Sequence, residues 1–177
     1  PKIKVYGVQS AGAPSMIQSL EHKKIEMLPS VSTIADGIAV KEPGVHTFEI
    51  CGKYADGVVS VTDDQVCAAI LALIEKQKMI AEGAGAVALA AVMYGKIPKV
   101  KGKKVVCLIS GGNIGVTILS RVINRGLLMG GRTATLTVEL MDKPGQLVAV
   151  SAIIAGCGGN VIGVLHERSN EGSDVNG

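Results

Sequence analysis

Residues 1–126 alternate between short apolar runs and longer segments in which apolar residues recur every three or four positions. Short runs of this kind predict β-strands, and the longer repeat predicts amphipathic helices. We expect strands at residues 2–8, 57–61 and 105–109, and helices at residues 14–22, 47–54, 62–79, 84–93 and 116–125. Strands that alternate with helices indicate an α/β fold built on a parallel, layered sheet.

Residues 105–113 are the most informative of these segments. An unbroken apolar run ends in Ser110, Gly111, Gly112 and Asn113, and a helical pattern follows. An apolar run without alternation predicts a strand that is buried on both faces. In open α/β sheets, ligands bind beyond the carboxyl ends of the strands, where glycines admit them to the main chain. Residues 110–113 are therefore our first candidate for a ligand site, with a simple helix cap as the alternative role of the serine.

Two helices have recognisable signals at their starts. Thr62 and Gln65 have the spacing of a capping box. The run that begins Gly83-Ala-Gly85 fits the GxGxx(G/A) pattern, but the dinucleotide-binding version of that pattern follows a strand. A long helix precedes it here, so we interpret it as a helix break with close packing. Glu82, at this break, either faces a pocket or points to water.

The pattern changes after the glycine-rich residues 126–131. Residues 133–140 alternate as a strand, 142–145 predict a turn, 146–155 a helix and 161–167 a second strand. This small α+β piece lacks partners for its strands, so we expect a domain that is cut midway, in a chain cut from something longer. The expected division is a first domain at 1–126, a linker at 127–132 and a second domain at 133–177.

Gly145 is the candidate functional residue of this second domain. In the simplest interpretation, residues 142–145 only turn the chain. In the alternative, the glycine lets a small effector approach the start of the next helix, beside Asp142, Gln146 and Leu147.

Composition and charge narrow the classes of function. The net charge of +3 is scattered and aromatic residues make up only 2%, which argues against nucleic-acid binding. The apolar runs are too short to predict a membrane span. The four cysteines and three histidines show neither disulfide nor metal-ligand spacing. We therefore expect reduced thiols, no metal site and a cytoplasmic protein.

Taken together, these segments resemble the threonine dehydratases (threonine ammonia-lyases), which belong to the second fold type of pyridoxal-phosphate (PLP) enzymes. The matching runs occur in the family's order and are Val5-Tyr-Gly-Val-Gln9, Thr33-Ile-Ala-Asp-Gly37, Val61-Thr-Asp-Asp64, Ala81-Glu-Gly-Ala-Gly-Ala86 and Leu108-Ile-Ser-Gly-Gly-Asn113. Residues 133–177 are similar to the first half of an ACT domain, a ferredoxin-like module that senses amino acids. The resemblance implies a fold type II sheet followed by a truncated ACT domain.

The resemblance also implies roles for single residues. Ser110 matches a serine whose hydroxyl bonds the pyridine nitrogen of PLP. A neutral hydroxyl does not hold that nitrogen protonated, so the ring is a weaker electron sink and suits elimination. Glu82 matches an acid near the cofactor ring, and Asp36-Gly37 matches the turn beside its face. The pocket is shaped by Gly111, Gly112 and Asn113.

Some elements of the family lie outside these motifs. The lysine that binds PLP as a Schiff base and the glycine-rich phosphate loop are expected upstream of Pro1, so we expect these 177 residues to be inactive alone. Metal-dependent relatives, such as serine racemases, carry an acid at the position of Gln9 and another near Ser15. This sequence has neither acid.

The resemblance implies that the whole enzyme converts L-threonine to 2-oxobutanoate and ammonia, with L-serine as a poorer substrate. It also implies a branched-chain amino acid as the effector. We expect a homo-oligomer, dimer or tetramer, because the strand edges of the second domain invite pairing with another chain. A serine/threonine racemase or a serine dehydratase of the same fold is the nearest alternative. The alternative of another class is a regulatory module that only binds a small amino acid and stays colourless, whereas bound PLP absorbs visible light.

Overall fold

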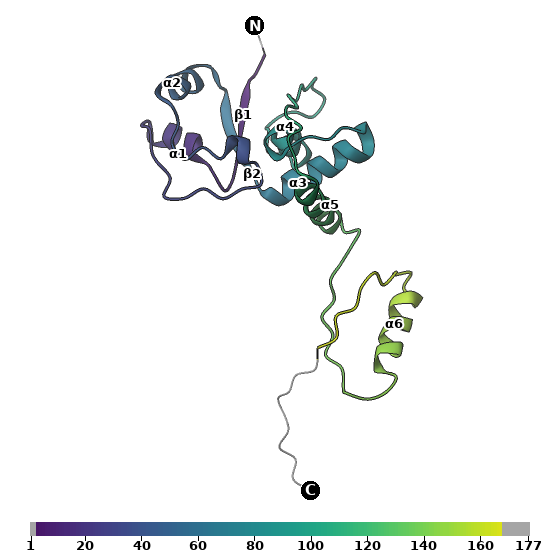
Figure 1. The fold of residues 1–177 in the computed structure, drawn as a ribbon. Coiled ribbons are helices and arrows are strands. Elements are labelled where there is room, and N and C mark those ends of the chain that lie inside the picture. Colours follow the sequence, from purple (N-terminus) through teal and green to yellow (C-terminus); the bar gives the residue numbers. More distant parts are fainter. Residues whose placement is uncertain (1–2, 168–177) are drawn as a thin grey trace. The chain divides into compact units, whose positions relative to one another are not determined.

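The computed structural model describes residues 3–167. Its contacts divide the chain into two compact units, of which one ends at Ala134 and the other begins at Thr135 (Figure 1). The stretch expected as a linker, residues 127–132, starts inside helix α5 (Val116–Met129). That helix passes through Gly126 without a break. A Cβ on Gly126 would lie only 3.0 Å from the Leu71 Cβ, so the glycine lets α5 approach α3 closely. This glycine serves helix packing and does not end the helix.

The first unit is built around two parallel strands, β1 (Tyr6–Ser10) and β2 (Gly57–Val61). Their register pairs the first residue of one strand with the first residue of the other, and continues to their last residues. The predicted parallel pairing is therefore confirmed, but the predicted bounds 2–8 are wrong, and Lys2 lies outside the described residues. The ladder starts at Tyr6 because the N–H of Val5 donates to the side chain of Asp56, at 2.8 Å from Oδ2.

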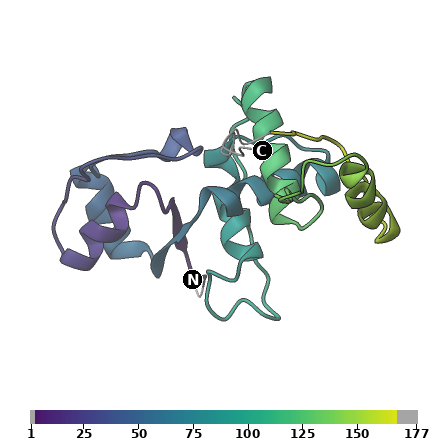
Figure 2. The ribbon, with the colours of Figure 1, turned by 90° about the horizontal axis from the view of Figure 1, so that it is seen from below.

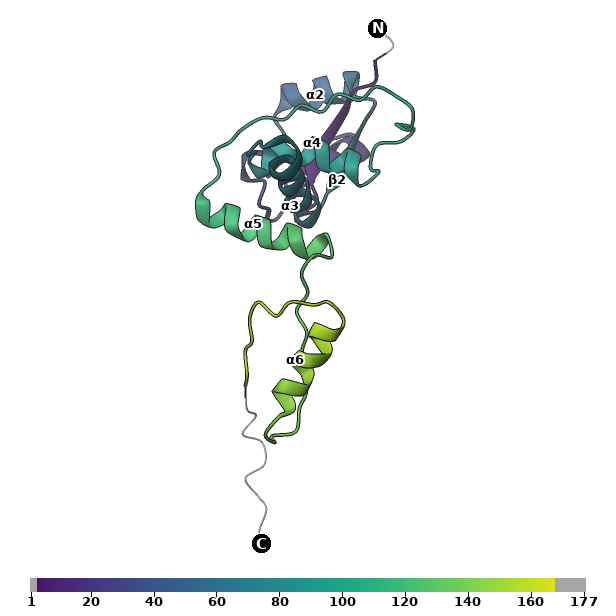
Figure 3. The ribbon, with the colours of Figure 1, turned by 90° about the vertical axis from the view of Figure 1, so that its right-hand side faces the viewer.

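Helices cover both sides of this strand pair. The helices α1 (Ser15–His22) and α2 (Val45–Tyr54) lie on one side, and α3 (Asp63–Ala72) and α4 (Gly83–Met93) lie on the other (Figures 1 and 2). α4 contacts both strands and α3, while α3 also contacts α5 (Figure 3). α3 therefore lies between α4 and α5, which makes it the central helix of the unit.

The start of α3 agrees with the prediction, whereas its end is less regular than predicted. Its capping box is confirmed, since Thr62 Oγ1 accepts the Gln65 N–H at 3.3 Å and Gln65 Oε1 accepts the Thr62 N–H at 3.0 Å. The predicted end near residue 79 is met to within two residues, but the last part is not a regular α-helix. The α-helix changes into a π-helical segment, η2 (Leu73–Gln77), and stops at Lys78, whose φ of 56° is left-handed.

The core lies where α3 meets β2, α4 and α5. Val61, Val66 and Ile70 are fully buried at its centre, and Ala86 brings α4 against them. Small residues on α4 let the helices pack closely, as dense protein cores require. Cys67 belongs to the same core, and burial raises the pKa of its thiol to about 11. At neutral pH this thiol is protonated and behaves as a small apolar side chain.

Residues 105–109 do not form the doubly buried strand that their composition predicts. They have no strand partner within the described residues, and Val106 and Leu108 are 95% and 79% exposed. Cys107 instead points toward α4, where its Sγ donates to the carbonyl oxygen of Ala88 at 3.8 Å. One side of the segment thus packs on α4 while the other faces solvent, because a strand is buried on both faces only inside a larger sheet.

The described part of the second unit contains one helix, α6 (Gln146–Gly156). The strands predicted at residues 133–140 and 161–167 are not formed, since neither segment is paired with another described segment. A strand needs a hydrogen-bonded neighbour to be stable. The last ten residues of the predicted second domain, 168–177, lie outside the described residues. Among residues 3–167, every helix is too short or too polar to cross a membrane.

Replacing Thr62 with alanine removes the hydroxyl that caps α3. The Gln65 N–H then loses its acceptor, so we expect the free energy of unfolding to fall by about 1 kcal/mol. Urea denaturation of the wild type and the variant measures this change. Thr62→Ser keeps the hydroxyl and should unfold near the wild-type midpoint, whereas equal losses in both variants would contradict the capping role.

Candidate functional site

Three segments that are far apart in the sequence meet at the N-terminus of α4. They are the turn η1 (Asp36–Ile38), Glu82 at the N-cap of α4, and the loop 110–113. The N–H of Glu82 donates to the carbonyl oxygen of Gly111 at 3.2 Å, and its Oε2 accepts the N–H of Asn113 at 3.1 Å. The structure thus brings together the residues that the sequence marks as cofactor-binding, which are Gly37, Glu82, Ser110, Gly111, Gly112 and Asn113.

Glycines in the first turn of α4 make this meeting possible. A Cβ on Gly83 would lie 2.5 Å from the carbonyl oxygen of Ile34, and a Cβ on Gly85 would lie 1.4 Å from the carbonyl oxygen of Ser110. Both distances are far shorter than any real van der Waals contact, so only glycine fits. The interpretation of this GxG run as a close-packing device is therefore confirmed. The element directly before it is the helical segment η2, whereas dinucleotide binding needs a strand there.

Two further glycines border the Glu82 carboxyl group. Gly111 has a φ of +71°, and a Cβ there would lie 2.2 Å from Glu82 Cδ. A Cβ on Gly37 would lie 3.1 Å from the Ala84 Cβ and 3.5 Å from Glu82 Oε1. The half-buried carboxylate therefore sits between two stretches of main chain that carry no side chain, and it is held in place by the Asn113 N–H.

A small cavity of about 30 Å³ lies beside Glu82. The side chains of Asp36, Glu82 and Asn113 form its polar wall, and isoleucines form most of its apolar wall. Such a volume admits only water, so a larger ligand has to lie over the exposed side of the loop, where Ser110 and Gly112 reach solvent. An exposed hydroxyl beside bare main chain and a carboxylate can hydrogen-bond a polar ligand that lies close to the main chain.

A second cavity, of about 280 Å³, borders η1 and is lined by Gly37, Gln9 and Ser15 among others. The polar groups of the last two residues are already engaged. Gln9 Oε1 accepts the N–H of Ile17 at 2.9 Å, and Ser15 Oγ donates to the carbonyl oxygen of Val40 at 2.7 Å. Residues 3–167 hold no group of three or more His, Cys, Asp or Glu side chains that could bind a metal ion. Gln9 thus stabilises the start of α1.

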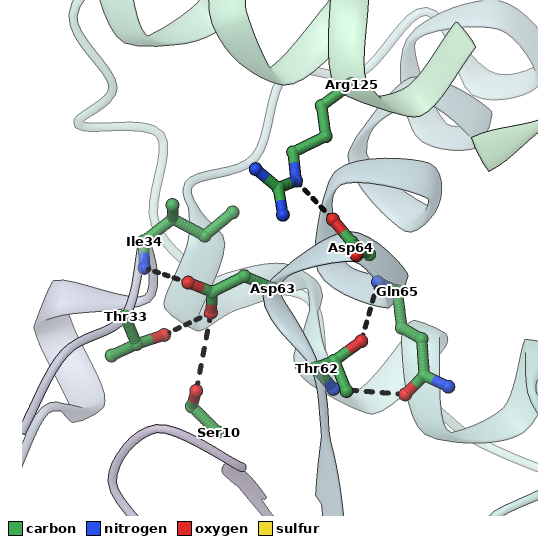
Figure 4. A network of polar contacts seen from close by, with 8 residues as sticks. All are labelled: Ser10, Thr33, Ile34, Thr62, Asp63, Asp64, Gln65 and Arg125. Carbon is green, nitrogen blue, oxygen red and sulfur yellow. Dashed lines mark hydrogen bonds and ion pairs between the residues drawn. The ribbon is translucent and has the colours of Figure 1, made fainter. Parts of the chain in front are cut away.

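No pattern in the sequence identifies the place of Asp63 next to η1. This first residue of α3 accepts hydrogen bonds from Ser10, Thr33 and the N–H of Ile34 (Figure 4). Its capping-box neighbours signal a helix start, but Thr33 and Ser10 lie 30 and 53 residues away. Local spacing cannot reveal partners at such separations, so only the folded chain shows this network.

Asp64, the next residue, faces the other way. It pairs with Arg125 of α5 (Figure 4), and this hydrogen bond raises the pKa of the Arg125 guanidinium. The ion pair joins α3 to α5 at the surface and does not touch the residues around Glu82. The two adjacent aspartates therefore serve different parts of the unit.

The candidate effector residues lie in the second unit, at the start of α6. Gly145 is the N-cap of that helix with a φ of +87°, a conformation in which a residue with a side chain is strained. The N–H of Gln146 donates to the carbonyl oxygen of Lys143 at 3.4 Å, and Leu147 is 47% exposed. Asp142 precedes them in the same turn, so the predicted residues form one local group.

Known proteins resemble this chain along most of its length. Residues 1–111 match the family model described as pyridoxal-phosphate dependent enzyme. An L-threonine ammonia-lyase from Thermotoga maritima is 48% identical over 169 residues, which are 96% of this chain and 42% of that protein. The chain thus spans less than half the length of this relative.

Solved structures agree with this match. The processed form of threonine deaminase isoform 2 from Solanum lycopersicum has a TM-score of 0.68 at 37% identity, over 72% of this chain and 36% of that one. The serine racemase from Dictyostelium discoideum has a TM-score of 0.59 at 36% identity, over 66% of this chain and 37% of that one. The family model covers more than half of the chain and includes Gly37, Glu82 and Ser110. This chain therefore belongs to the family of pyridoxal-phosphate dependent enzymes.

Proposed function

We propose that this chain is part of a threonine ammonia-lyase, which uses PLP to convert L-threonine to 2-oxobutanoate and ammonia. The observation that carries the proposal is the meeting of Gly37, Glu82 and Ser110 around one exposed patch of bare main chain. The name of the Thermotoga maritima relative, which aligns with nearly the whole chain, supports threonine as the substrate.

The residues of this patch fit the pyridine end of PLP. When bound, PLP supplies a conjugated ring that draws electrons from the α-carbon of an amino acid. The Ser110 hydroxyl would hold the ring nitrogen, and Gly111 and Gly112 leave the main chain beside it free of side chains. A neutral hydroxyl would not hold that nitrogen protonated, and an unprotonated ring would suit elimination better than transamination. Glu82, fixed by the Asn113 N–H, bounds the site at the ring edge.

A serine/threonine racemase or a serine dehydratase is the second candidate, supported by the likeness to a serine racemase structure. The geometry of Gln9 favours the lyase, because its amide oxygen caps α1 and carries no formal charge for a metal ion. Product analysis separates the candidates, since a racemase releases a D-amino acid and a lyase releases a 2-oxo acid and ammonia. We expect slower turnover of L-serine than of L-threonine.

We further propose that the part of the chain from residue 133 belongs to an ACT domain that senses a branched-chain amino acid in a cytoplasmic homo-oligomer. Two features support this role. Gly145 leaves the start of α6 open to a small ligand. Exposed apolar side chains at alternate positions, such as Leu136, Val138 and Leu140, suit pairing with further strands.

Ser110→Ala in the complete enzyme tests the cofactor role. Loss of the hydrogen bond between Ser110 and the ring nitrogen should lower turnover of L-threonine by about 5- to 150-fold, corresponding to about 1–3 kcal/mol. Assays of 2-oxobutanoate and visible spectra of bound PLP measure the effect. Ser120→Ala makes the same change on the exposed face of α5 and should match the wild type. The structure already excludes a helix cap, because Gly115 holds the N-cap position of α5. Wild-type turnover and spectrum in Ser110→Ala would therefore remove the cofactor role of Ser110.

Removal of divalent metal ions should leave the complete enzyme active. Gln9 and Ser15 offer a neutral amide and a hydroxyl that are already hydrogen-bonded, whereas Mg²⁺ and Ca²⁺ prefer carboxylate oxygens. Activity after exhaustive dialysis against EDTA is the measurement. An activity that disappears and returns with Mg²⁺, but not with K⁺, would contradict this expectation.

Gly145→Val should weaken the response of the complete enzyme to isoleucine and valine. A branched side chain at a φ of +87° is strained and also fills the space before α6. Threonine saturation curves with and without each effector measure the response. Gly158→Val imposes the same kind of strain, at a φ of +80°, but lies outside this turn. This control variant should keep the wild-type response to isoleucine and valine. Wild-type curves that neither amino acid shifts would leave the second unit without a sensing role.

A further inference from the structure

The carboxylate of Asp63 holds three groups from two other segments of the first unit (Figure 4). Its Oδ1 accepts the hydroxyl of Thr33 at 2.6 Å and that of Ser10 at 3.4 Å. Its Oδ2 accepts the N–H of Ile34 at 3.1 Å. The capping box of α3 uses Thr62 and Gln65 and does not need this carboxylate. The contacts of Asp63 are therefore additional to what starts the helix.

Each of the two hydroxyl groups donates one hydrogen bond and accepts another. Thr33 Oγ1 also accepts the N–H of Ala35 at 3.1 Å, and Ser10 Oγ also accepts the N–H of Gly12 at 3.2 Å. Because a carboxylate only accepts hydrogen bonds, each hydroxyl must direct its proton at Asp63 and its lone pairs at the amide. The network thus fixes the orientation of both side chains and the path of both loops.

The loop that Asp63 holds leads directly into the candidate site. Residues 33–35 run into η1, which carries Asp36 and Gly37 beside Glu82. Ala35 is fully buried, and a Cβ on Gly83 would lie 2.9 Å from its Cα. The loop is therefore in direct main-chain contact with the first turn of α4. A shift of the loop would have to move either η1 or α4.

We propose that Asp63 is a positioning residue of the cofactor site, an inference that rests on the proposed PLP-dependent function. Its carboxylate sets the place of the Asp36-Gly37 turn against Glu82 without touching the ligand itself. The competing interpretation is a negative charge that merely stabilises the start of α3. Asp64 is the matched control for that interpretation, because it lies in the same first turn and pairs with Arg125 instead.

The test compares Asp63→Asn, Asp64→Asn, Thr33→Val and Thr33→Ser in the complete enzyme. Asp63→Asn replaces one carboxylate oxygen with an NH₂ group, which can only donate. That group faces either the N–H of Ile34 or the two hydroxyls, so at least one hydrogen bond of the wild type is lost. Thr33→Val keeps the shape of threonine but removes the hydroxyl, whereas Thr33→Ser retains it. The measurements are PLP affinity, by titration of the apoenzyme, circular dichroism of bound PLP at visible wavelengths, and the thermal unfolding midpoint.

We expect Asp63→Asn and Thr33→Val to weaken PLP binding by about tenfold or more, as loss of a charge-assisted hydrogen bond allows. We also expect both to change the visible circular dichroism, which reports the surroundings of the ring. Thr33→Ser and Asp64→Asn should keep the PLP affinity and the visible circular dichroism of the wild type. Should Asp63→Asn not fold, the Thr33→Val and Thr33→Ser pair decides the question by itself.

Three results would overturn the inference, and the last of them is distinguishable from the first two. If the wild type binds PLP and Thr33→Val binds it equally well with the same circular dichroism, Asp63 only stabilises the fold. The same conclusion follows if Asp63→Asn and Asp64→Asn lower the unfolding midpoint alike while PLP binding is unchanged. If the wild type binds no PLP, the proposed function fails and this inference fails with it.

Discussion

Main-chain contact at the first turn of α4 is the constraint on which the rest of the first unit's site depends. Gly83 lies against the loop before η1, and Gly85 lies against the carbonyl group of Ser110. Any side chain at either position would push one of these loops away. Glu82, which precedes them, would then lose the hydrogen bonds that join it to Gly111 and Asn113. The position of the Glu82 carboxylate thus depends on the absence of side chains at Gly83 and Gly85.

Local spacing in the sequence predicted those features whose atoms lie within one or two turns of each other, whereas the parallel pairing was predicted from the order of the elements. The capping box of Thr62 and Gln65 is such a feature, because both of its hydrogen bonds span three residues. The GxG run at Gly83 is another, since glycines with a helix on either side signal close packing. Asp63 is the contrasting case. Its contacts are made with Ser10 and Thr33. These two residues lie next to Asp63 only because β1 pairs with β2 and because of the path of the chain between the strands.

The segments predicted as strands after residue 104 show a different limit of prediction from sequence. The composition of residues 105–109 indicates how much apolar surface the segment could bury, but burial also needs a neighbour on each face. Val106 and Leu108 have none among the described residues and lie in solvent, whereas Cys107 packs on α4. The same reasoning applies to residues 133–140. An apolar pattern therefore predicts a strand only together with the strands beside it.

The order in which these contacts occur along the chain bears on how the unit is assembled during synthesis. Val5 and Asp56 are 51 residues apart, and Ser10 and Asp63 are 53 residues apart, so both contacts close long loops. Contacts between residues so far apart in the sequence form more slowly than local contacts do. Asp63 leaves the ribosome fifty residues before Asn113, whose N–H is the last group that Glu82 needs. A nascent chain can therefore set the turn η1 in place while the Glu82 carboxylate still lacks its donor.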